Sequence, residues 1–269
     1  MKNYRTSPLV RAGIALTAVG SFLVIALVSV TASTTQPRSE TSQTKTAAIP
    51  KTGKTINKQA VWAETPKTDP LPAGARQSDW NLVLVNLAHK HMTDFPVQLK
   101  DVGNGQQVDA RIAPQLLAFL AAAKTINTDE HFISGYRSIA YQTQLFNDYI
   151  SNEKSSGKTP ADAEAAAMKY SQPPGASEHM TGLAMDMAAG SSLDSNQAPD
   201  ISKLEALAVN YGFILRFPKA PGTSNPDVKN PSTGIEYEYW HWRYVGVENA
   251  KYMTARGLTL EEYVAKLPK

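Results

Sequence analysis

The stretch Ser177–Asp186, with the sequence SEHMTGLAMD, combines residue types that bind a metal ion. His179 offers an imidazole and Asp186 a carboxylate, two of the three ligand types that zinc takes in proteins. If the chain turns at Gly182 and then continues as a strand, Asp186 shares one face with the small residues Gly182 and Ala184. These small residues leave room for an ion and a substrate. The alternate positions are apolar and suited to burial: Leu183, Met185 and Met187.

A second motif with matching chemistry lies at Glu236–Tyr244, with the sequence EYEYWHWRY. His241 would be the third ligand, and Glu238 would be the general base for an attacking water. Three protein ligands and one open position are typical of a catalytic zinc site and not of a closed structural one. The aromatic residues favour a strand, in which Glu238 and His241 would face opposite ways. We therefore expect a bend or bulge between them.

These motifs resemble those of a known enzyme family. The pattern S-x-H-x-x-G-x-A-x-D followed by E-x-W-H is similar to that of the VanY-type D-alanyl-D-alanine carboxypeptidases, whose superfamily also holds lysostaphin-like peptidases and the hedgehog signalling domain. The segment Ser134–Ser138 (SGYRS), Gln142 and the ending Gly257–Tyr263 (GLTLEEY) also match. The resemblance covers roughly residues 80 to 265. Two departures are Tyr239, where the family more often has proline, and a longer loop, Lys219–Ser232.

The resemblance implies a zinc carboxypeptidase that removes the C-terminal D-alanine from peptidoglycan stem peptides. It implies one zinc ion per domain, bound by His179, Asp186 and His241, with Glu238 as the base. Arg137 would hold the substrate carboxylate or the developing oxyanion, because a guanidinium fork suits paired oxygens. The remaining substrate-binding residues implied are Ser177, Gln142 and Trp240.

Two alternatives remain open. An endopeptidase that cuts cross-bridges would need a groove open at both ends, and Arg137 favours a substrate with a free terminal carboxylate. A non-catalytic, zinc-containing wall-binding module would not need a base at Glu238. The sequence does not separate D,D- from L,D-carboxypeptidase action, nor tetrapeptide from pentapeptide substrates.

The N-terminal part predicts a membrane anchor and a spacer. Residues 12–32 form an uncharged apolar run of about the length that spans a bilayer. Basic residues precede it, so residues 1–11 should be cytoplasmic and the remainder should lie on the cell-wall side of a bacterium. A cleaved signal peptide is the rival interpretation. Residues 33–76 predict a disordered linker, and 77–269 the catalytic domain.

The composition limits which classes of binding partner are expected. The 269 residues include no cysteine, which excludes disulfides and thiolate ligands. The part after residue 76 carries 17 basic and 21 acidic residues, so a basic face for nucleic acid is not expected. The expected partners are stem peptides and, through the N-terminal helix, the membrane, and we expect a monomer.

The pattern of short strands and amphipathic helices predicts an α+β fold, a small, mainly antiparallel sheet with surrounding helices. The expected strands are Leu82–Val85, Phe132–Ile133, Phe213–Leu215 and Tyr237–Tyr244. Helices should begin at Pro114, after Ser138, after Thr159, at a capping box Ser202–Glu205, and at another from Thr259 to Glu262. The expected core-facing positions of the first two helices are Leu116, Leu117, Phe119, Leu120, Tyr141, Leu145 and Tyr149.

Overall fold

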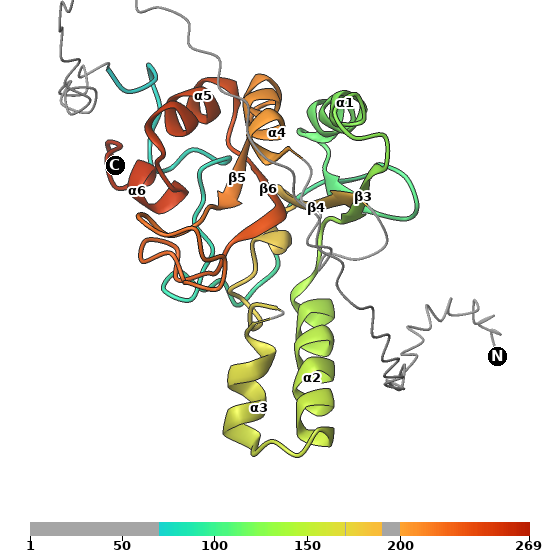
Figure 1. Ribbon diagram of the computed structural model, residues 1–269. Helices are drawn as coiled ribbons and strands as arrows, with labels where there is room; N and C mark the ends of the chain where they lie inside the picture. Colours follow the sequence, from blue (N-terminus) through green and yellow to red (C-terminus); the bar gives the residue numbers. More distant parts are fainter. Residues whose placement is uncertain (1–69, 170, 190–199) are drawn as a thin grey trace, which may run out of the picture. The chain divides into compact units, whose positions relative to one another are not determined.

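A four-stranded antiparallel sheet lies among the helices of the described chain (Figure 1). The computed structural model describes residues 70–169, 171–189 and 200–269. The strand order is β3 (Glu130–Ser134), β4 (Ala184–Ala189), β6 (Glu238–Tyr244) and β5 (Phe213–Phe217). A separate two-stranded hairpin consists of β1 (Leu99–Asp101) and β2 (Gln107–Asp109). The predicted α+β class with a small antiparallel sheet is confirmed.

The register of the sheet brings the predicted motifs together. Asp186 on β4 pairs with Ser134 on one side and with His241 on the other. The pairing of β5 with β6 shifts between Leu215, opposite Trp242, and Phe217, opposite Glu238. Two residues of β5 therefore span four of β6, which is the irregularity expected between Glu238 and His241.

Helices surround the sheet. α1 (Ala113–Ala123) and α4 (Ile201–Ala208), with the short 3-10 helix η2 (Val209–Tyr211), lie near one another and contact the sheet. α5 (Val247–Arg256) and α6 (Leu260–Val264) complete the chain. α2 (Ile139–Ser155) and α3 (Pro160–Ala167) lie side by side and project away from the sheet (Figure 1). A second 3-10 helix, η1 (Glu178–Thr181), leads into β4.

Two apolar clusters hold these elements. In the first, Leu183, which precedes β4, and Met185 and Met187 of β4 are buried with α1 and α4, as their alternation in sequence predicted. Phe119 of α1 stacks on Phe213 at 5.4 Å and meets Trp242 edge-on at 5.3 Å between ring centroids. The second cluster lies under α5 and α6 and includes Leu82 and Ile214. Burial of this apolar surface supplies the main driving force for folding.

Side-chain caps begin several helices where the sequence placed them. The hydroxyls of Ser138 and Thr159 accept hydrogen bonds from backbone N–H groups in the first turns of α2 and α3. Thr259 and Glu262 form the predicted capping box of α6. The α4 cap differs from its prediction. Asp200, not Ser202, accepts from the backbone N–H of Lys203, so the helix begins two residues earlier than the expected capping box.

The predicted strand at Leu82–Val85 is wrong. Leu82 and Val85 are buried, but no strand pairs with this segment among the described residues. The Nη2 atom of Arg243 donates instead to the carbonyls of Asn81 and Val83, at 3.2 and 2.9 Å. A buried side chain thus satisfies backbone groups that a neighbouring strand would otherwise satisfy.

Two helix faces also differ from prediction. Tyr141 is 55% exposed, and the buried residues of α2 are Gln142 and Phe146. The projecting pair of α2 and α3 buries a narrow stripe of each helix, and an i, i+4 pattern cannot reveal which stripe that is. Leu117 of α1 is 48% exposed, although its neighbour Leu116 is fully buried.

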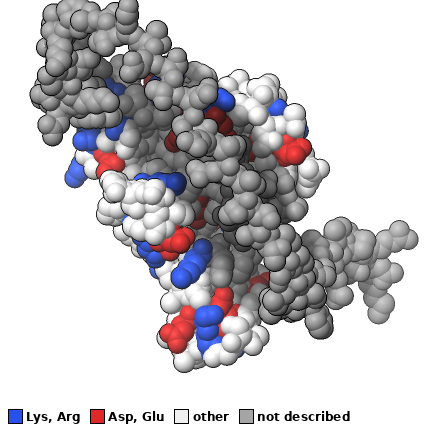
Figure 2. Space-filling model, viewed as in Figure 1, with Lys and Arg blue, Asp and Glu red and all other residues white. Residues whose placement is uncertain are grey.

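The predicted anchor 12–32 and most of the linker 33–76 lie outside the described residues. Within the described residues no helix is long and apolar enough to cross a bilayer. Leu71 and Ala75 pack against the second apolar cluster, and the Gln77 side chain donates to the Leu267 carbonyl. Packed structure therefore begins ahead of position 77. Basic and acidic side chains are interspersed on the visible face of the described chain (Figure 2).

Candidate metal centre

The imidazole of His179 is oriented by a backbone carbonyl on one side of its ring. This residue lies in η1, which ends at Gly182 in a left-handed conformation with φ of 69°. Its Nδ1 atom lies 2.7 Å from the carbonyl oxygen of Gly135 and donates to it, which leaves Nε2 free as a ligand. Gly135 must be glycine, because a Cβ there would lie 2.3 Å from the Gln107 carbonyl oxygen. The glycine of the SGYRS motif thus lets β2 approach and positions His179.

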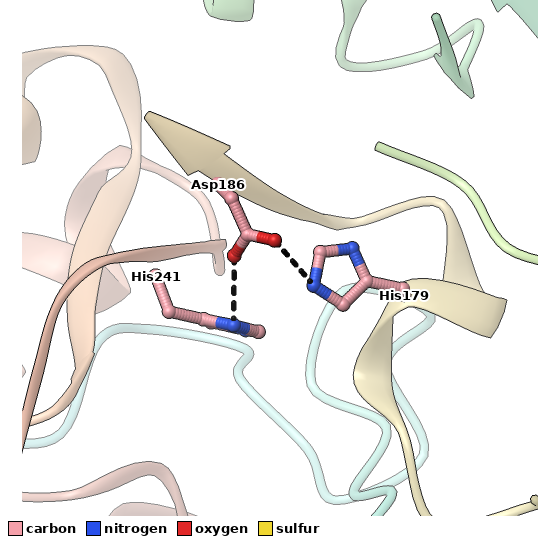
Figure 3. Close-up of side chains that lie close together, drawn as sticks. All are labelled: His179, Asp186 and His241. Atoms are coloured by element: carbon pink, nitrogen blue, oxygen red, sulfur yellow. Dashed lines mark ion pairs between the residues drawn. The ribbon is translucent and has the colours of Figure 1, made fainter. Parts of the chain in front are cut away.

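Asp186 lies between the two histidines (Figure 3). Its Oδ2 is 3.3 Å from His179 Nε2, and its Oδ1 is 3.3 Å from His241 Nδ1. The candidate ligand atoms of the three residues all lie within 4.8 Å of one another. Two ligands bound to one tetrahedral zinc ion at about 2.0–2.1 Å would be about 3.3 Å apart. The three residues, all buried, therefore fit a zinc ion.

An unpartnered atom supports the same assignment. Asp186 Oδ1 is buried and has no hydrogen-bond partner among the described residues. Buried polar groups are normally paired or coordinate a cation. A cation between Asp186 and the histidines would satisfy this oxygen.

Electrostatics make the site attractive to a cation. Burial alone would lower the pKa of His241, but the neighbouring carboxylates of Asp186 and Glu178 raise this pKa to about 9. Burial would raise the pKa of Asp186, and the neighbouring histidines hold that pKa below its usual range. Burial, followed by Arg137, lowers the pKa of His179, which keeps this imidazole neutral and able to ligate. A zinc ion would compete with the proton on His241 for the same negative surroundings.

The ligands open into a pocket of about 260 Å³. Glu238, Arg137, Ser177 and Trp240 line it together with the three ligand residues, as the motifs predicted. Glu238 Oε2 is 3.6 Å from His241 Nδ1, so this carboxylate adjoins the position of an ion. Burial raises the pKa of Glu238 to about 7, which suits a general base near neutral pH.

Arg137 and Gln142 both make contacts that the sequence did not predict. Arg137 Nη2 donates to Asp186 Oδ2 at 2.8 Å, and its Nε donates to Ser134 Oγ at 3.0 Å. Gln142 is buried and is not among the described residues that line the pocket. Its amide nitrogen donates to Ser171 Oγ and to the Gln172 carbonyl, at 2.7 and 2.6 Å. Gln142 thus supports a wall of the pocket from behind.

The residue that sequence reasoning missed is Glu178. It lies between Ser177 and His179, is buried, and binds Arg216 and Arg243 through its Oε1 atom, each at 2.8 Å. A signal was present in the sequence: Arg216 interrupts an otherwise apolar strand, β5, and Arg243 lies among the aromatic residues of β6. A buried arginine requires a carboxylate or carbonyl partner.

An antiparallel sheet that presents three zinc-type ligands and an adjacent half-buried carboxylate in an open pocket defines a metal-dependent hydrolase site. Comparison with known proteins gives the family. The family model described as VanY, D-alanyl-D-alanine carboxypeptidase, matches residues 105–247. A D-alanyl-D-alanine carboxypeptidase of Enterococcus faecalis (strain ATCC 700802 / V583) is 35% identical over 205 residues, which cover 75% of this chain and 73% of the relative. The chain belongs to the VanY family of D-alanyl-D-alanine carboxypeptidases.

Solved structures agree with this assignment. VanYB in complex with D-alanine-D-alanine is 34% identical, with a TM-score of 0.59, over 70% of this chain and 99% of that chain. A vancomycin-resistance D,D-pentapeptidase VanY mutant in complex with Zn(II) is 35% identical, with a TM-score of 0.58, over 69% of this chain and 99% of that chain. The LdcB LD-carboxypeptidase is 29% identical, with a TM-score of 0.51, over 71% of this chain and 88% of that chain. The family resemblance inferred from the motifs is confirmed.

Proposed function

We propose that this chain is a zinc-dependent carboxypeptidase that removes one C-terminal D-alanine from peptidoglycan stem peptides. The observation that carries the proposal is one pocket lined by the ligands His179, Asp186 and His241 and by the half-buried carboxylate Glu238. The likeness to VanYB in complex with D-alanine-D-alanine supports the substrate class.

Glu238 supplies the proton transfers in this proposal. Zinc bound by the three ligands supplies Lewis acidity, which polarises the scissile carbonyl and makes water acidic enough to attack near neutral pH. Glu238 accepts a proton from the attacking water and returns it to the leaving amine nitrogen as the C–N bond breaks. One water is consumed, and the products are a shortened peptide and free alanine.

Arg137 recognises the end of the substrate in this proposal. Two of its guanidinium nitrogens contact Asp186 and Ser134, and Nη1 has no hydrogen-bond partner among the described residues. Arg137 also lines the pocket. A terminal carboxylate is the feature that separates a chain end from a chain middle, and an arginine binds carboxylates with good geometry. This favours exo-cleavage over the endopeptidase alternative.

L,D-carboxypeptidase action is a second candidate, because the chain is also similar to the LdcB LD-carboxypeptidase. The two candidates differ in the residue that precedes the scissile bond. Pentapeptides ending in D-Ala-D-Ala and tetrapeptides ending in a single D-Ala separate them, and the D,D assignment predicts faster cleavage of the pentapeptide.

The proposed location follows from the sequence alone. Residues 12–32 would anchor a single-pass protein, with residues 33–76 as a spacer and the catalytic domain on the cell-wall side. Labelling of intact cells with an impermeant reagent would test this. Labelling of the domain only after lysis would refute it.

A double-mutant cycle tests the role of Arg137. The four combinations are wild type and Arg137→Ala, each with a pentapeptide that has a free or an amidated C-terminus. Arg137→Ala also removes a hydrogen-bond donor to Asp186, so the loss of activity in this variant combines a damaged metal site with a lost substrate contact. The coupling free energy from the cycle isolates the contact between Arg137 and the terminal carboxylate of the substrate. A charged hydrogen bond of about 1.5–3 kcal/mol predicts a coupling of roughly 10- to 150-fold in kcat/KM.

The matched control is Arg111→Ala, because this exposed arginine pairs with Asp109 and does not line the pocket. Its coupling to the amide should be close to onefold. If Arg137 also shows no coupling and amidated peptides are cut as fast as free acids, Arg137 does not recognise the carboxylate, and the endopeptidase alternative gains support.

A further inference from the structure

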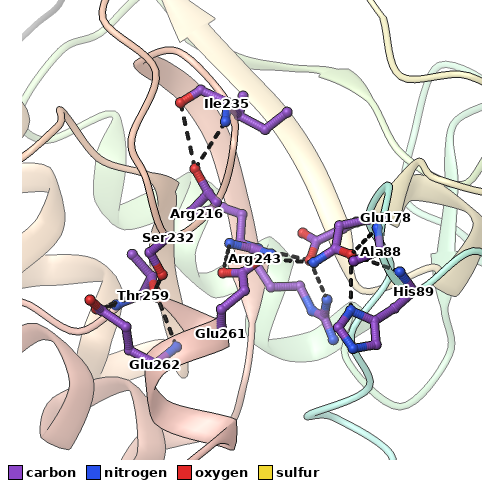
Figure 4. A network of polar contacts seen from close by, with 12 residues as sticks. Ala88, His89, Glu178, Arg216, Ser232, Ile235, Arg243, Thr259, Glu261 and Glu262 are labelled. Atoms are coloured by element: carbon purple, nitrogen blue, oxygen red, sulfur yellow. Dashed lines mark hydrogen bonds and ion pairs between the residues drawn. The ribbon is translucent and has the colours of Figure 1, made fainter.

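A network of charged side chains adjoins the candidate metal centre through Glu178. Figure 4 shows its members Glu178, Arg216, Arg243 and Glu261. Glu178 precedes the ligand His179, Arg216 lies on β5, Arg243 on β6, and Glu261 in the first turn of α6. Both arginines are fully buried. Arg216 donates to Glu178 Oε1 at 2.8 Å and to both carboxylate oxygens of Glu261, at 2.9 and 2.6 Å. The network therefore links the metal-binding turn to the C-terminal helix.

The network fixes the orientation of the Glu178 carboxylate. Its Oε1 atom accepts from Arg216 Nε and from Arg243 Nη1, both at 2.8 Å. Its Oε2 atom lies 3.5 Å from His241 Nε2. Within the described chain these two facing atoms are both buried and have no other hydrogen-bond partner. A shift of a few tenths of an ångström would close a hydrogen bond between them and satisfy both.

We propose that Glu178 is a positioning residue that accepts the Nε2–H of His241 and so holds this ring with Nδ1 toward the metal. The proposal rests on the metal site of the proposed function, and it does not depend on which peptide is cut. His179 is held in the complementary way, because its Nδ1–H donates to Gly135 and its Nε2 faces Asp186. Each histidine would then have one ring nitrogen held by a fixed acceptor and the other free for the ion.

The composition of the network favours this role over a purely structural one. A buried ion pair is seldom more stabilising than apolar residues of the same size, because each charge loses its hydration. Four charged groups beside the site are therefore weak evidence for a contribution to stability. They are well suited to holding one carboxylate oxygen in a defined place. The capping box of α6, formed by Thr259 and Glu262, fixes the turn that carries Glu261.

The test is the zinc affinity of the full chain, measured by competition with a chromogenic chelator in the absence of peptide. Glu178→Gln keeps the size of the side chain but offers only one acceptor oxygen. If that oxygen faces the two arginines, His241 Nε2 loses its acceptor, and if it faces His241, both arginines lose theirs. Loss of a partner beyond the metal ligands typically weakens metal binding by about 10- to 100-fold, and we expect a loss in this range. A histidine ¹H–¹⁵N NMR spectrum of the zinc-loaded wild type should show His241 bound through Nδ1 and protonated at Nε2.

The matched control is Glu261→Gln, which removes a carboxylate from the same network and from Arg216 but makes no contact with His241. If Glu178 serves only to neutralise the arginines, the two variants should lose zinc affinity equally at equal thermal stability, and that result would overturn the proposal. So would a Glu178→Gln variant that binds zinc as tightly as wild type, or a His241 that is bound through Nε2.

Glu178→Asp is the second variant if the glutamine form does not fold. It keeps the charge but shortens the reach toward His241, and the same 10- to 100-fold loss is expected. A wild type that binds zinc but cleaves no stem peptide would refute the proposed function and leave this proposal standing. A wild type that binds no zinc would overturn both.

Discussion

Replacing Glu238 by glutamine should abolish most turnover while the zinc remains bound. The carboxylate lies 3.6 Å from His241 Nδ1 and is not one of the three candidate ligands, so its loss removes a base and not a metal contact. General acid–base catalysis contributes roughly 10²- to 10⁴-fold. That range corresponds to about 3–5 kcal/mol of activation free energy. We therefore expect kcat on a D-Ala-D-Ala pentapeptide to fall by this factor, with KM little changed.

The assay follows release of alanine under saturating peptide, with zinc content measured on the same preparation. Glu236→Gln is the matched control, because Glu236 also lines the pocket but forms no ion pair with the ligand residues in the described chain. It should keep kcat within about threefold of wild type, because a carboxylate that does not adjoin the metal ligands is not placed to take the proton of the attacking water. A Glu238→Gln variant that is fully zinc-loaded and nearly as active as wild type would mean that another group is the base.

Two further predictions concern the scaffold. Burial raises the pKa of Glu130 from 4.5 to about 7, above that of the unfolded chain, so the folded state binds this proton more tightly and stability falls as pH rises from about 4.5 through 7. The free energy of unfolding of Glu130→Gln, measured in urea, should therefore equal that of wild type near pH 4 and exceed it by about 1–3 kcal/mol above pH 8. Equal free energies of unfolding at both pH values would refute the shift. Gly135→Ala should displace the carbonyl that holds His179 and weaken zinc binding at least about tenfold. The control is Gly105→Ala, which has open space around it and should cost only about 1–2 kcal/mol of backbone strain. Normal zinc affinity in Gly135→Ala would show that this contact does not position the ligand.

The sequence predicted the metal-binding residues well because they act through local patterns. His179 lies just before the turn at Gly182, and Asp186 is the third residue of the strand that follows it. Their short separation in sequence therefore limits how they can lie relative to each other. The irregularity before His241 was also predictable, since strict alternation could not have brought Glu238 and His241 to one site. Register across β3, β4 and β6 then brought the separate motifs together, and that register was not visible in any single stretch.

Long-range contacts account for what was missed or wrong. The Leu82–Val85 segment has a strand-like sequence, but Arg243 from a position 160 residues away occupies the carbonyl of Val83. Glu178 drew no functional prediction because its partners lie on β5 and β6. The exposed side of α2 depended on how far the helix projects from the sheet, which an i, i+4 pattern does not encode.

Zinc-dependent release of a single terminal D-alanine tests the central claim most directly. The full chain is stripped of metal, reloaded with zinc, and incubated with a stem pentapeptide ending in D-Ala-D-Ala, with an L-Ala-terminated peptide as control. We predict that mass spectrometry will show the loss of one alanine from the first peptide only, and only after zinc is restored. Cleavage that survives removal of the metal, or fragments cut inside the peptide, would contradict the account.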